Sequence, residues 1–201
     1  MRLQSLVLIS FLSLLSPVRA VPNEPPAIAV RFEGSSSASP GGLIFAGWTD
    51  GTIVWSQDQK KGGPPYQTSK IDPAKFTNLL AKLEKDGVFK KTSDDLFYRG
   101  PDASYHQIEL LSGKKHIYLE SWHEAYEGNN TKTVATSYGL TTLDEGKTRE
   151  KVLSEDNDSY RAFRKLWSEI RDFTTKLIPD KGEPCKDEPK WELPEWEKIP
   201  Q

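Results

Sequence analysis

Two β-hairpin patterns, each followed by an amphipathic helical stretch, constrain the fold of this chain more than any other feature of its sequence. In the first pattern, the apolar, β-prone residues 43–48 and 52–55 flank Asp50-Gly51. This pair favours a two-residue turn because glycine adopts the positive φ that such a turn requires. In the second pattern, residues 107–111 and 116–122 flank a short polar turn. Two-residue alternation predicts that the second hairpin buries the face carrying Ile108, Leu110, Ile117 and Leu119.

The stretch after each hairpin has the apolar period of a helix. Asp72 is placed to cap the first helix, and Pro73 suits its first turn because no N–H partner is needed there. Gly87 predicts a left-handed end for this helix. The second helix is expected to begin near residues 156–159 and to stop before Pro179. The predicted apolar stripes comprise Phe76, Leu79, Leu80 and Leu83 in the first helix, and Tyr160, Phe163, Leu166, Trp167, Ile170 and Phe173 in the second.

This ββα-ββα order predicts an α+β fold, an antiparallel sheet of two hairpins with two helices on one face. We place the single domain at residues 43–178, with a polar insertion at 127–158. The Pro/Ser/Gly-rich segment 21–42 precedes it and is expected to contribute an edge strand, residues 27–33. The Pro/Lys/Glu-rich tail 179–201 has the composition of a disordered segment, but its tryptophans also suit docking into surface grooves.

The first 20 residues have the pattern of a signal peptide. A basic start, Met1-Arg2, precedes an apolar run at residues 6–15, and Val18-Arg19-Ala20 predicts cleavage after Ala20. The run is shorter than the roughly 20 apolar residues that span a bilayer, although a retained anchor is the alternative. Cleavage would leave 201 minus 20, or 181, residues, and no transmembrane segment. We therefore expect export to the periplasm, the cell envelope or the medium.

Composition indicates in which compartment the protein works and which partners are not expected. The whole chain has 27 basic and 29 acidic residues. Removing Arg2 and Arg19 leaves 25 against 29, a net charge of 25 − 29 = −4, with no basic stripe, so nucleic acid is not an expected partner. One cysteine, Cys185, allows no internal disulfide. Small secreted proteins of complex cells often depend on several disulfides, so this chain is more typical of a bacterial envelope protein. We take the chain as a monomer.

The segment Gly62-Gly63-Pro64-Pro65-Tyr66 (GGPPY) has two interpretations. As a corner, its glycines permit a sharp reversal and its prolines extend the chain on the way from the sheet to the first helix, with Tyr66 packed beneath. As a binding loop, it would present Tyr66 on a rigid support. It is not a phosphate-binding loop, because the spaced glycines and the Gly-Lys-Ser/Thr ending are missing.

The segments GWTDGTIVWS, GGPPY, GPDAS and SWHE occur in this order between residues 43 and 127. At these spacings the chain resembles a group of uncharacterised secreted proteins of planctomycete-type bacteria. The resemblance implies an exported bacterial protein. No activity is assigned to that group, so the resemblance implies no catalytic residue.

The densest chemical cluster is Ser121-Trp122-His123-Glu124. A zinc-peptidase motif would need a second histidine four residues after His123, where the chain has Glu127. A site that combines His123 with the other two histidines, His106 and His116, is an alternative. In the structural interpretation, Trp122 packs and His123 forms hydrogen bonds at the end of a strand. We expect Tyr66 and Trp122 to meet at one end of the sheet.

These observations favour an exported, non-catalytic protein that acts by binding or as an envelope component, with no cofactor or metal and no catalytic residue. The partner is taken to be a protein or a carbohydrate, and the candidate binding residues are Tyr66, Trp122, His123 and Glu124. One alternative is a metal-assisted hydrolase that uses His123 and Glu124. Another is a carbohydrate-binding module that uses exposed tryptophan or tyrosine. Exposure of Trp48, Tyr66 and Trp122 would favour the binding interpretations.

Overall fold

The computed structural model describes residues 21–35, 41–100, 104–127, 132–144 and 146–191. The predicted signal peptide therefore lies outside the described residues, as do the middle of GPDAS and the last ten residues of the tail. Within the described residues, no helix combines the length and apolarity needed to cross a membrane.

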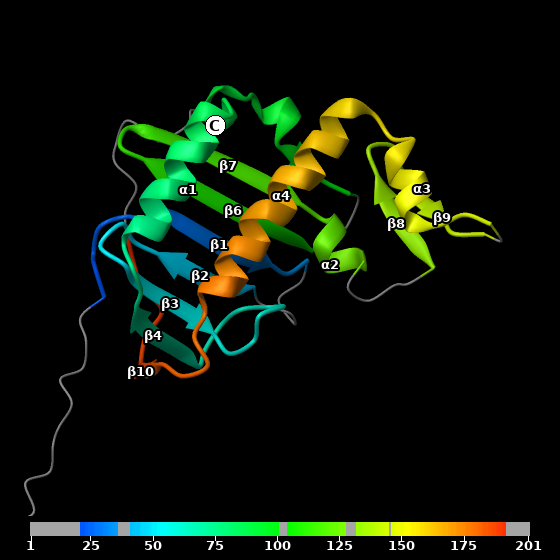
Figure 1. Ribbon diagram of the computed structural model, residues 1–201. Coiled ribbons are helices and arrows are strands. Elements are labelled where there is room, and N and C mark those ends of the chain that lie inside the picture. The colour runs from blue at the N-terminus through cyan, green and yellow to red at the C-terminus, as the bar shows by residue number, and fades with distance from the viewer. Residues whose placement is uncertain (1–20, 36–40, 101–103, 128–131, 145, 192–201) are drawn as a thin grey trace, which may run out of the picture.

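An eight-stranded sheet forms the centre of the molecule, in the order β10-β4-β3-β2-β1-β6-β7-β5 (Figure 1). Neighbouring strands are antiparallel except β5 and β7, which are parallel. The strands are β1 (Ile28–Glu33), β2 (Gly42–Gly47), β3 (Thr52–Ser56), β4 (Tyr66–Lys70), β5 (Phe97–Tyr98), β6 (Tyr105–Ser112), β7 (Lys115–Ser121) and β10 (Glu183–Cys185).

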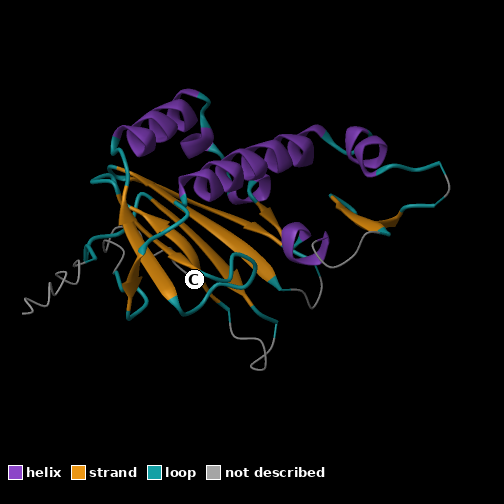
Figure 2. Ribbon diagram, turned by 60° about the horizontal axis from the view of Figure 1, so that its bottom comes forward, coloured by secondary structure: helices purple, strands orange, loops and turns teal. Residues whose placement is uncertain are grey.

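Two long helices, α1 (Ala74–Lys85) and α4 (Asp158–Leu177), lie over one face of this sheet (Figures 1 and 2). Two short 3-10 turns, Val88–Lys90 and Ser93–Asp95, follow α1, and α2 (His123–Glu127) follows β7. Beyond α2, a separate two-stranded sheet of β8 (Thr133–Thr136) and β9 (Gly139–Thr142) projects from the side of the molecule together with α3 (Arg149–Ser154). We call this projection, residues 132–156, the arm.

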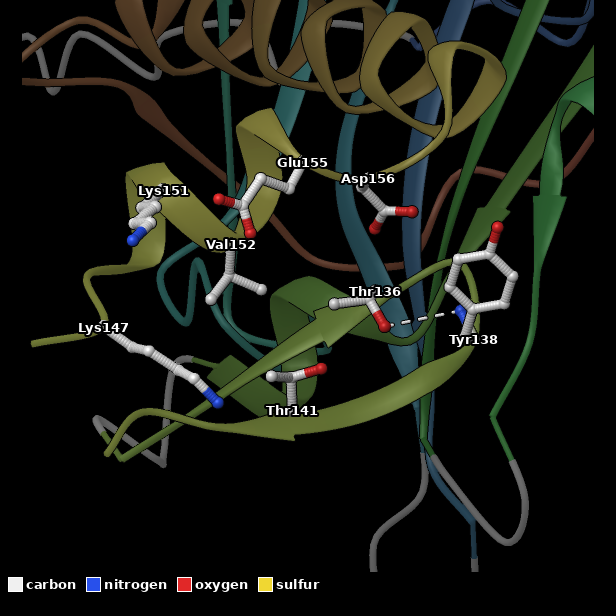
Figure 3. Close-up of a pocket in the computed structure, with 8 residues that line it drawn as sticks. All are labelled: Thr136, Tyr138, Thr141, Lys147, Lys151, Val152, Glu155 and Asp156. Carbon is white, nitrogen blue, oxygen red and sulfur yellow. Dashed lines mark hydrogen bonds between the residues drawn. The ribbon is translucent and has the colours of Figure 1, made fainter. Parts of the chain in front are cut away.

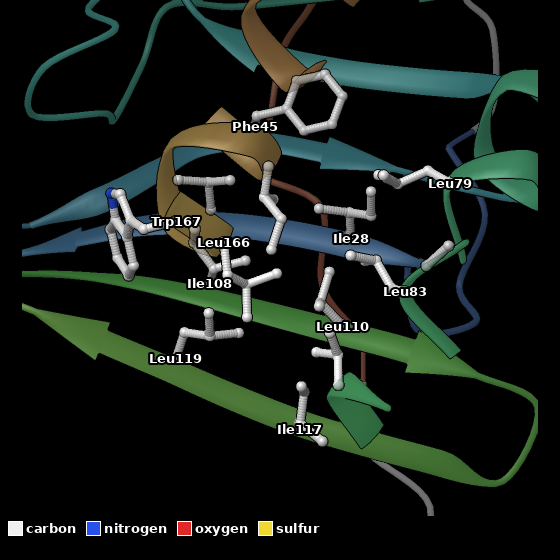
Figure 4. Close-up of a cluster of buried hydrophobic side chains, with 14 of the residues drawn as sticks. Ile28, Phe45, Leu79, Leu83, Ile108, Leu110, Ile117, Leu119, Leu166 and Trp167 are labelled. Atoms are coloured by element: carbon white, nitrogen blue, oxygen red, sulfur yellow. The ribbon is translucent and has the colours of Figure 1, made fainter. Parts of the chain in front are cut away.

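The main core lies between the sheet and the two long helices (Figure 4). The predicted α1 stripe is confirmed, because Phe76, Leu79, Leu80 and Leu83 are all buried. The predicted α4 stripe is buried apart from Phe173, which packs at the edge of the core. The two helices also begin where the sequence predicted. Asp72 accepts a hydrogen bond from the Ala74 N–H at 3.0 Å at the start of α1, and Asn157 caps α4.

A second, smaller core covers the other face of the sheet. It contains Trp48 and Tyr66, and residues from both ends of the described chain pack against it. The segment 183–191, which we call the C-terminal strap, adds β10 to the sheet edge and then crosses this face to Trp191. Trp191 meets Trp48 edge to face at 6.2 Å. The described part of the tail is therefore docked.

The predicted arrangement of the fold is wrong in three respects, although the protein does combine helices with a sheet. The sheet is mixed and has eight strands, and the element order is not ββα-ββα. The predicted edge strand, β1, is central: it pairs with both β2 and β6 and so joins the two hairpins into one sheet. The prediction also omitted β4, β5 and β10.

The two hairpins are present as β2–β3 and β6–β7. The first turn is one residue longer than predicted, because the Trp48 N–H donates to the Thr52 carbonyl and leaves three residues in the loop. Gly51 takes its expected positive φ, 84°, at the end of this loop, which is the position where three-residue hairpin loops need it.

Candidate functional site

The GGPPY segment is a corner between β3 and β4. Gly62 and Gly63 have φ values of 70° and 84°, and the Gly63 N–H donates to the Leu43 carbonyl at 3.0 Å. The corner packs so closely on the sheet that a Cβ atom on Gly42 would lie 2.4 Å from the Gly63 nitrogen. Contrary to the prediction, the segment does not lead to α1; Tyr66 begins β4.

Tyr66 lies inside the second core with an exposed fraction of 1%. Its hydroxyl donates to Glu188 of the strap at 3.0 Å, and burial raises the pKa of the phenol. The predicted contact between Tyr66 and Trp122 is wrong. Strands β3, β2, β1 and β6 lie between β4 and β7, which separates the two strands by about 24 Å at the usual strand spacing.

Trp122 and Trp48 are also buried, with exposed fractions of 5% and 1%. The Trp122 ring lies against Gly100, where an added Cβ would come within 2.6 Å of it. The Trp48 indole N–H donates to the Glu24 carbonyl at 2.8 Å. Both side chains therefore have packing roles that explain their presence.

His123 is the first residue of α2, so the cluster joins a strand to a helix instead of ending in a strand. The ring packs edge-on against Phe163 and Trp167, and its Nδ1 forms a hydrogen bond with the hydroxyl of buried Ser121. Burial, with a smaller effect of Arg164, holds the pKa of His123 well below its usual value. The imidazole is therefore neutral at neutral pH.

Glu124 is fully engaged by α4. Arg171 donates from Nε and Nη2 to Oε1 at 3.0 and 2.8 Å, and the Trp167 indole N–H donates to Oε2 at 2.7 Å. Burial, the largest single influence, would by itself raise the pKa of Glu124, but Arg171, His106 and Trp167 together outweigh it, and the pKa falls below its usual value. Glu124 is thus a charged partner in an ion pair between helices.

The proposed metal ligands do not come together. Glu127, four residues after His123, pairs with Arg164 at 2.9 Å and also with Arg149. His106 faces the helices from β6, whereas His116 points to the opposite face, where it meets Glu109. In the part of the chain that the structure describes, no group of three His, Cys, Asp or Glu side chains could hold a metal ion.

These α2 and α4 side chains border a shallow cavity of about 490 Å³, together with Arg149 of α3. Four of its charged side chains form two ion pairs, Glu124 with Arg171 and Glu127 with Arg149. The arrangement chiefly fastens α2, α3 and α4 together.

A second cavity, of about 330 Å³, lies on the arm between the β8–β9 hairpin and α3 (Figure 3). We call it the arm groove. The hairpin contributes Thr136, Tyr138 and Thr141, and Val152 and Glu155 come from α3 and its end. Lys147, Lys151 and Asp156 complete the lining.

Tyr138 is the most exposed large apolar side chain among the described residues, at 87%. Its turn is held in place by buried Asp156, which accepts a hydrogen bond from the Ser137 N–H at 3.0 Å. Thr136 Oγ1 accepts a further hydrogen bond from the Tyr138 N–H (Figure 3). An aromatic ring is thus displayed to solvent on an ordered turn.

Side chains of the main domain anchor the inner strand of the arm, β8. The Tyr160 hydroxyl donates to the Ala135 carbonyl at 3.1 Å, and the Ala135 N–H donates to Glu127 at 2.9 Å. Within the arm itself, Arg149 of α3 donates to the Thr133 carbonyl at 3.2 Å. The arm groove is therefore built on a fixed support.

The groove was not predicted, because residues 127–158 have the polar, turn-rich composition of an insertion. The one local signal is Tyr138-Gly139 between two threonine-rich segments, a short hairpin pattern. No known protein-family model matches the chain, and comparison with curated proteins finds no similar sequence.

Proposed function

We propose that this protein is an exported, non-catalytic binding protein of the bacterial envelope and that it binds its ligand in the arm groove. The observation that supports this most directly is Tyr138, a ring 87% exposed at the groove and held on an anchored turn. Exposed aromatic side chains on rigid supports provide contact area at a low entropic cost. Export rests on the signal-peptide pattern of residues 1–20 and on the resemblance to secreted bacterial proteins.

The contacts that His123 and Glu124 already make support a binding function over a catalytic one. A general acid or base must reach its substrate, but His123 is buried and bonded to Ser121. Glu124 already holds Arg171 and Trp167. A hydrolase that uses His123 and Glu124 would have to break these contacts first.

Carbohydrate is the ligand class that the groove favours. The ring of Tyr138 offers a stacking surface at one end of a groove that Thr136, Thr141 and Glu155 also line (Figure 3). Sugars present both apolar ring faces and hydroxyl groups, so they match an aromatic ring combined with small polar groups. The described tryptophans are not exposed enough to provide this stacking surface, so Tyr138 takes their place in this proposal.

A binding measurement with the Tyr138→Ser variant tests the proposal. Calorimetry would compare the mature protein and the variant for binding to polysaccharides extracted from the envelope of the source bacterium. We expect affinity to fall by roughly tenfold, which corresponds to about 1.4 kcal/mol.

Phe97→Ser is the matched control, because Phe97 is another partly exposed aromatic residue, at 37%, on strand β5, which does not line the groove. It should bind like the parent protein. Equal affinity of Tyr138→Ser and the parent, or equal losses in both variants, would contradict the assignment of the arm groove. Intact mass of the exported protein tests export separately, with Val21 as the expected first residue.

A further inference from the structure

We propose that the outer edge of β9 pairs antiparallel with β9 of a second copy of this chain, which joins two arms into a four-stranded sheet. The dimer differs from the monomer assumed from the sequence. It also goes beyond the proposed function, since pairing uses the backbone of β9 and not the ring of Tyr138.

The hydrogen-bonding register of the arm shows which backbone groups of β9 face outward. The Leu143 N–H donates to the Lys132 carbonyl at 2.7 Å, and Val134 lies opposite Thr141. Because hydrogen-bonded and non-hydrogen-bonded pairs alternate in an antiparallel ladder, Thr141 points its N–H and C=O groups toward β8. Leu140 and Thr142 point theirs away from β8.

The two edges of the arm differ in how these outward groups are satisfied. On β8, side chains of Arg149, Glu127 and Tyr160 bond three of the four outward groups of Thr133 and Ala135, namely the Thr133 carbonyl and both groups of Ala135. On β9, the outward groups of Leu140 and Thr142 have no hydrogen-bond partner among the described residues. In that part of the chain, β8 is also the only strand that pairs with β9. Isolated two-stranded sheets are marginally stable, so a further strand would stabilise the arm.

A second copy suits this edge because the edge is self-complementary. With Thr141 on a two-fold axis, Leu140 of each chain lies opposite Thr142 of the other. Both are outward-facing residues, so each such pair exchanges two hydrogen bonds, and the four bonds of the dimer use every outward group of both residues.

The side chains permit the same pairing. Residues 138–143 carry no charge, so the two-fold axis brings no like charges together, and the segment lacks the lysine, proline or bulge that usually protects an edge strand. Leu140 is half exposed, at 50%, and would pack against Thr142 of the other chain. Isologous contacts of this kind close into a dimer and do not propagate.

Cysteine cross-linking tests the register. In a Cys185→Ser background, Thr141→Cys places two thiols opposite each other in a non-hydrogen-bonded pair, where Cα atoms lie about 4.5 Å apart. We expect a mild oxidant to convert this variant largely to a disulfide-linked dimer. Thr142→Cys is the matched control: its two copies lie diagonally, more than about 7 Å apart, which is too far for a disulfide.

Sedimentation over a concentration series tests the equilibrium without cross-linking. A contact of this size predicts a weak dimer whose fraction rises with concentration. Thr142→Pro should weaken dimerisation roughly tenfold, because it removes two of the four ladder bonds while the bonds to β8 remain. Leu140→Asp, which keeps the whole backbone, should also weaken it by placing like charges near the axis.

Three outcomes would overturn the proposal. They are a parent protein that stays monomeric throughout the series, a dimer that Thr142→Pro and Leu140→Asp leave intact, and equal cross-linking of the Thr141 and Thr142 variants. A protein that stays monomeric and binds a foreign extended peptide at the β9 edge would also overturn the proposal. Sugar binding by the Tyr138 groove is measured separately, so its failure would leave the dimer proposal standing.

Discussion

Two buried histidines lie on the helix side of the sheet, and burial keeps both of them neutral. The Nε2–H of His106 donates a hydrogen bond to the Lys60 carbonyl at 3.0 Å, while its Nδ1 has no partner among the described residues. His123 is bonded to Ser121. Burial lowers the pKa of each imidazole below the usual 6.5. These histidines therefore resist protonation as long as the protein is folded.

Acid should destabilise the protein through these two residues. Below about pH 6.5 the unfolded chain binds protons that the folded chain does not, so the free energy of unfolding decreases as pH falls. Each histidine contributes up to about 1.4 kcal/mol per pH unit, until pH reaches its folded pKa. Urea unfolding at a series of pH values between neutral and mildly acidic measures this slope.

The His123→Gln variant is the comparison for the acid effect. It should show a smaller loss of stability with acid than the parent, because glutamine does not titrate. An unchanged slope in this variant would mean that His123 does not contribute. A parent protein that becomes more stable on acidification would contradict the lowered pKa of both histidines.

At this scale the sequence located the chemically dense residues but not their environment. The Ser-Trp-His-Glu cluster does lie where a strand meets α2. Whether Trp122 or Tyr66 is exposed depends on Gly100 and Glu188, which are distant in sequence from the residues they cover or bond. Local periodicity contains no information about such neighbours.

The arm depends on a small ion-pair network at its base. Glu127 of α2 bonds Arg164 of α4, Arg149 of α3 and the Ala135 N–H of β8. One carboxylate therefore links four elements, and its side chain is mostly shielded from water. Removing one partner from a shielded pair is costly because the other charge stays unpaired.

Glu127→Ala should therefore lower the free energy of unfolding by about 3–5 kcal/mol. Glu84→Ala is the matched control, because Glu84 also pairs with a basic residue, Lys115, but both side chains are about half exposed. Exposed pairs contribute about 0–1 kcal/mol. Urea unfolding of both variants measures the difference, and equal losses would show that the network does not anchor the arm.

Long elements were predictable and short ones were not. Helices α1 and α4 carry several turns of periodic apolar residues, and β6 and β7 carry clear alternation. In contrast, β5 has two residues and β10 has three, including a proline. Such strands form because the sheet edge offers partners, which is a tertiary effect that their own sequences do not encode.

The two faces of the whole sheet are covered in different ways. One face lies under α1 and α4, which fold from local patterns. The other face is closed by the C-terminal strap: Glu188 bonds Arg31 at 2.6 Å, and Trp191 lies under the Arg31 guanidinium at 4.8 Å. Stability of the second core therefore depends on residues near the end of the chain.

Removing the strap should destabilise the whole molecule. A chain that ends at Lys181 loses the pairing of β10 with β4 and the packing of Trp191, and it leaves the Tyr66 hydroxyl unpaired. We expect the free energy of unfolding to fall by at least about 3 kcal/mol, with increased binding of a hydrophobic dye to the uncovered face.

A chain that ends at Trp191 is the control for this truncation, because it keeps every strap contact described above. It should be close to the parent in urea unfolding and in dye binding. If the shorter truncation were as stable as this control, the strap would not be part of the folded core.

The strap also determines when the protein finishes folding during its own synthesis. Ribosomes release the N-terminus first, and strands β2 to β4 emerge long before residues 183–191. Every nascent chain shorter than this therefore displays Trp48 and Tyr66 on an open apolar surface. Holding chaperones bind such surfaces, so we expect nascent chains of this protein to need shielding until residues 183–191 have been synthesised.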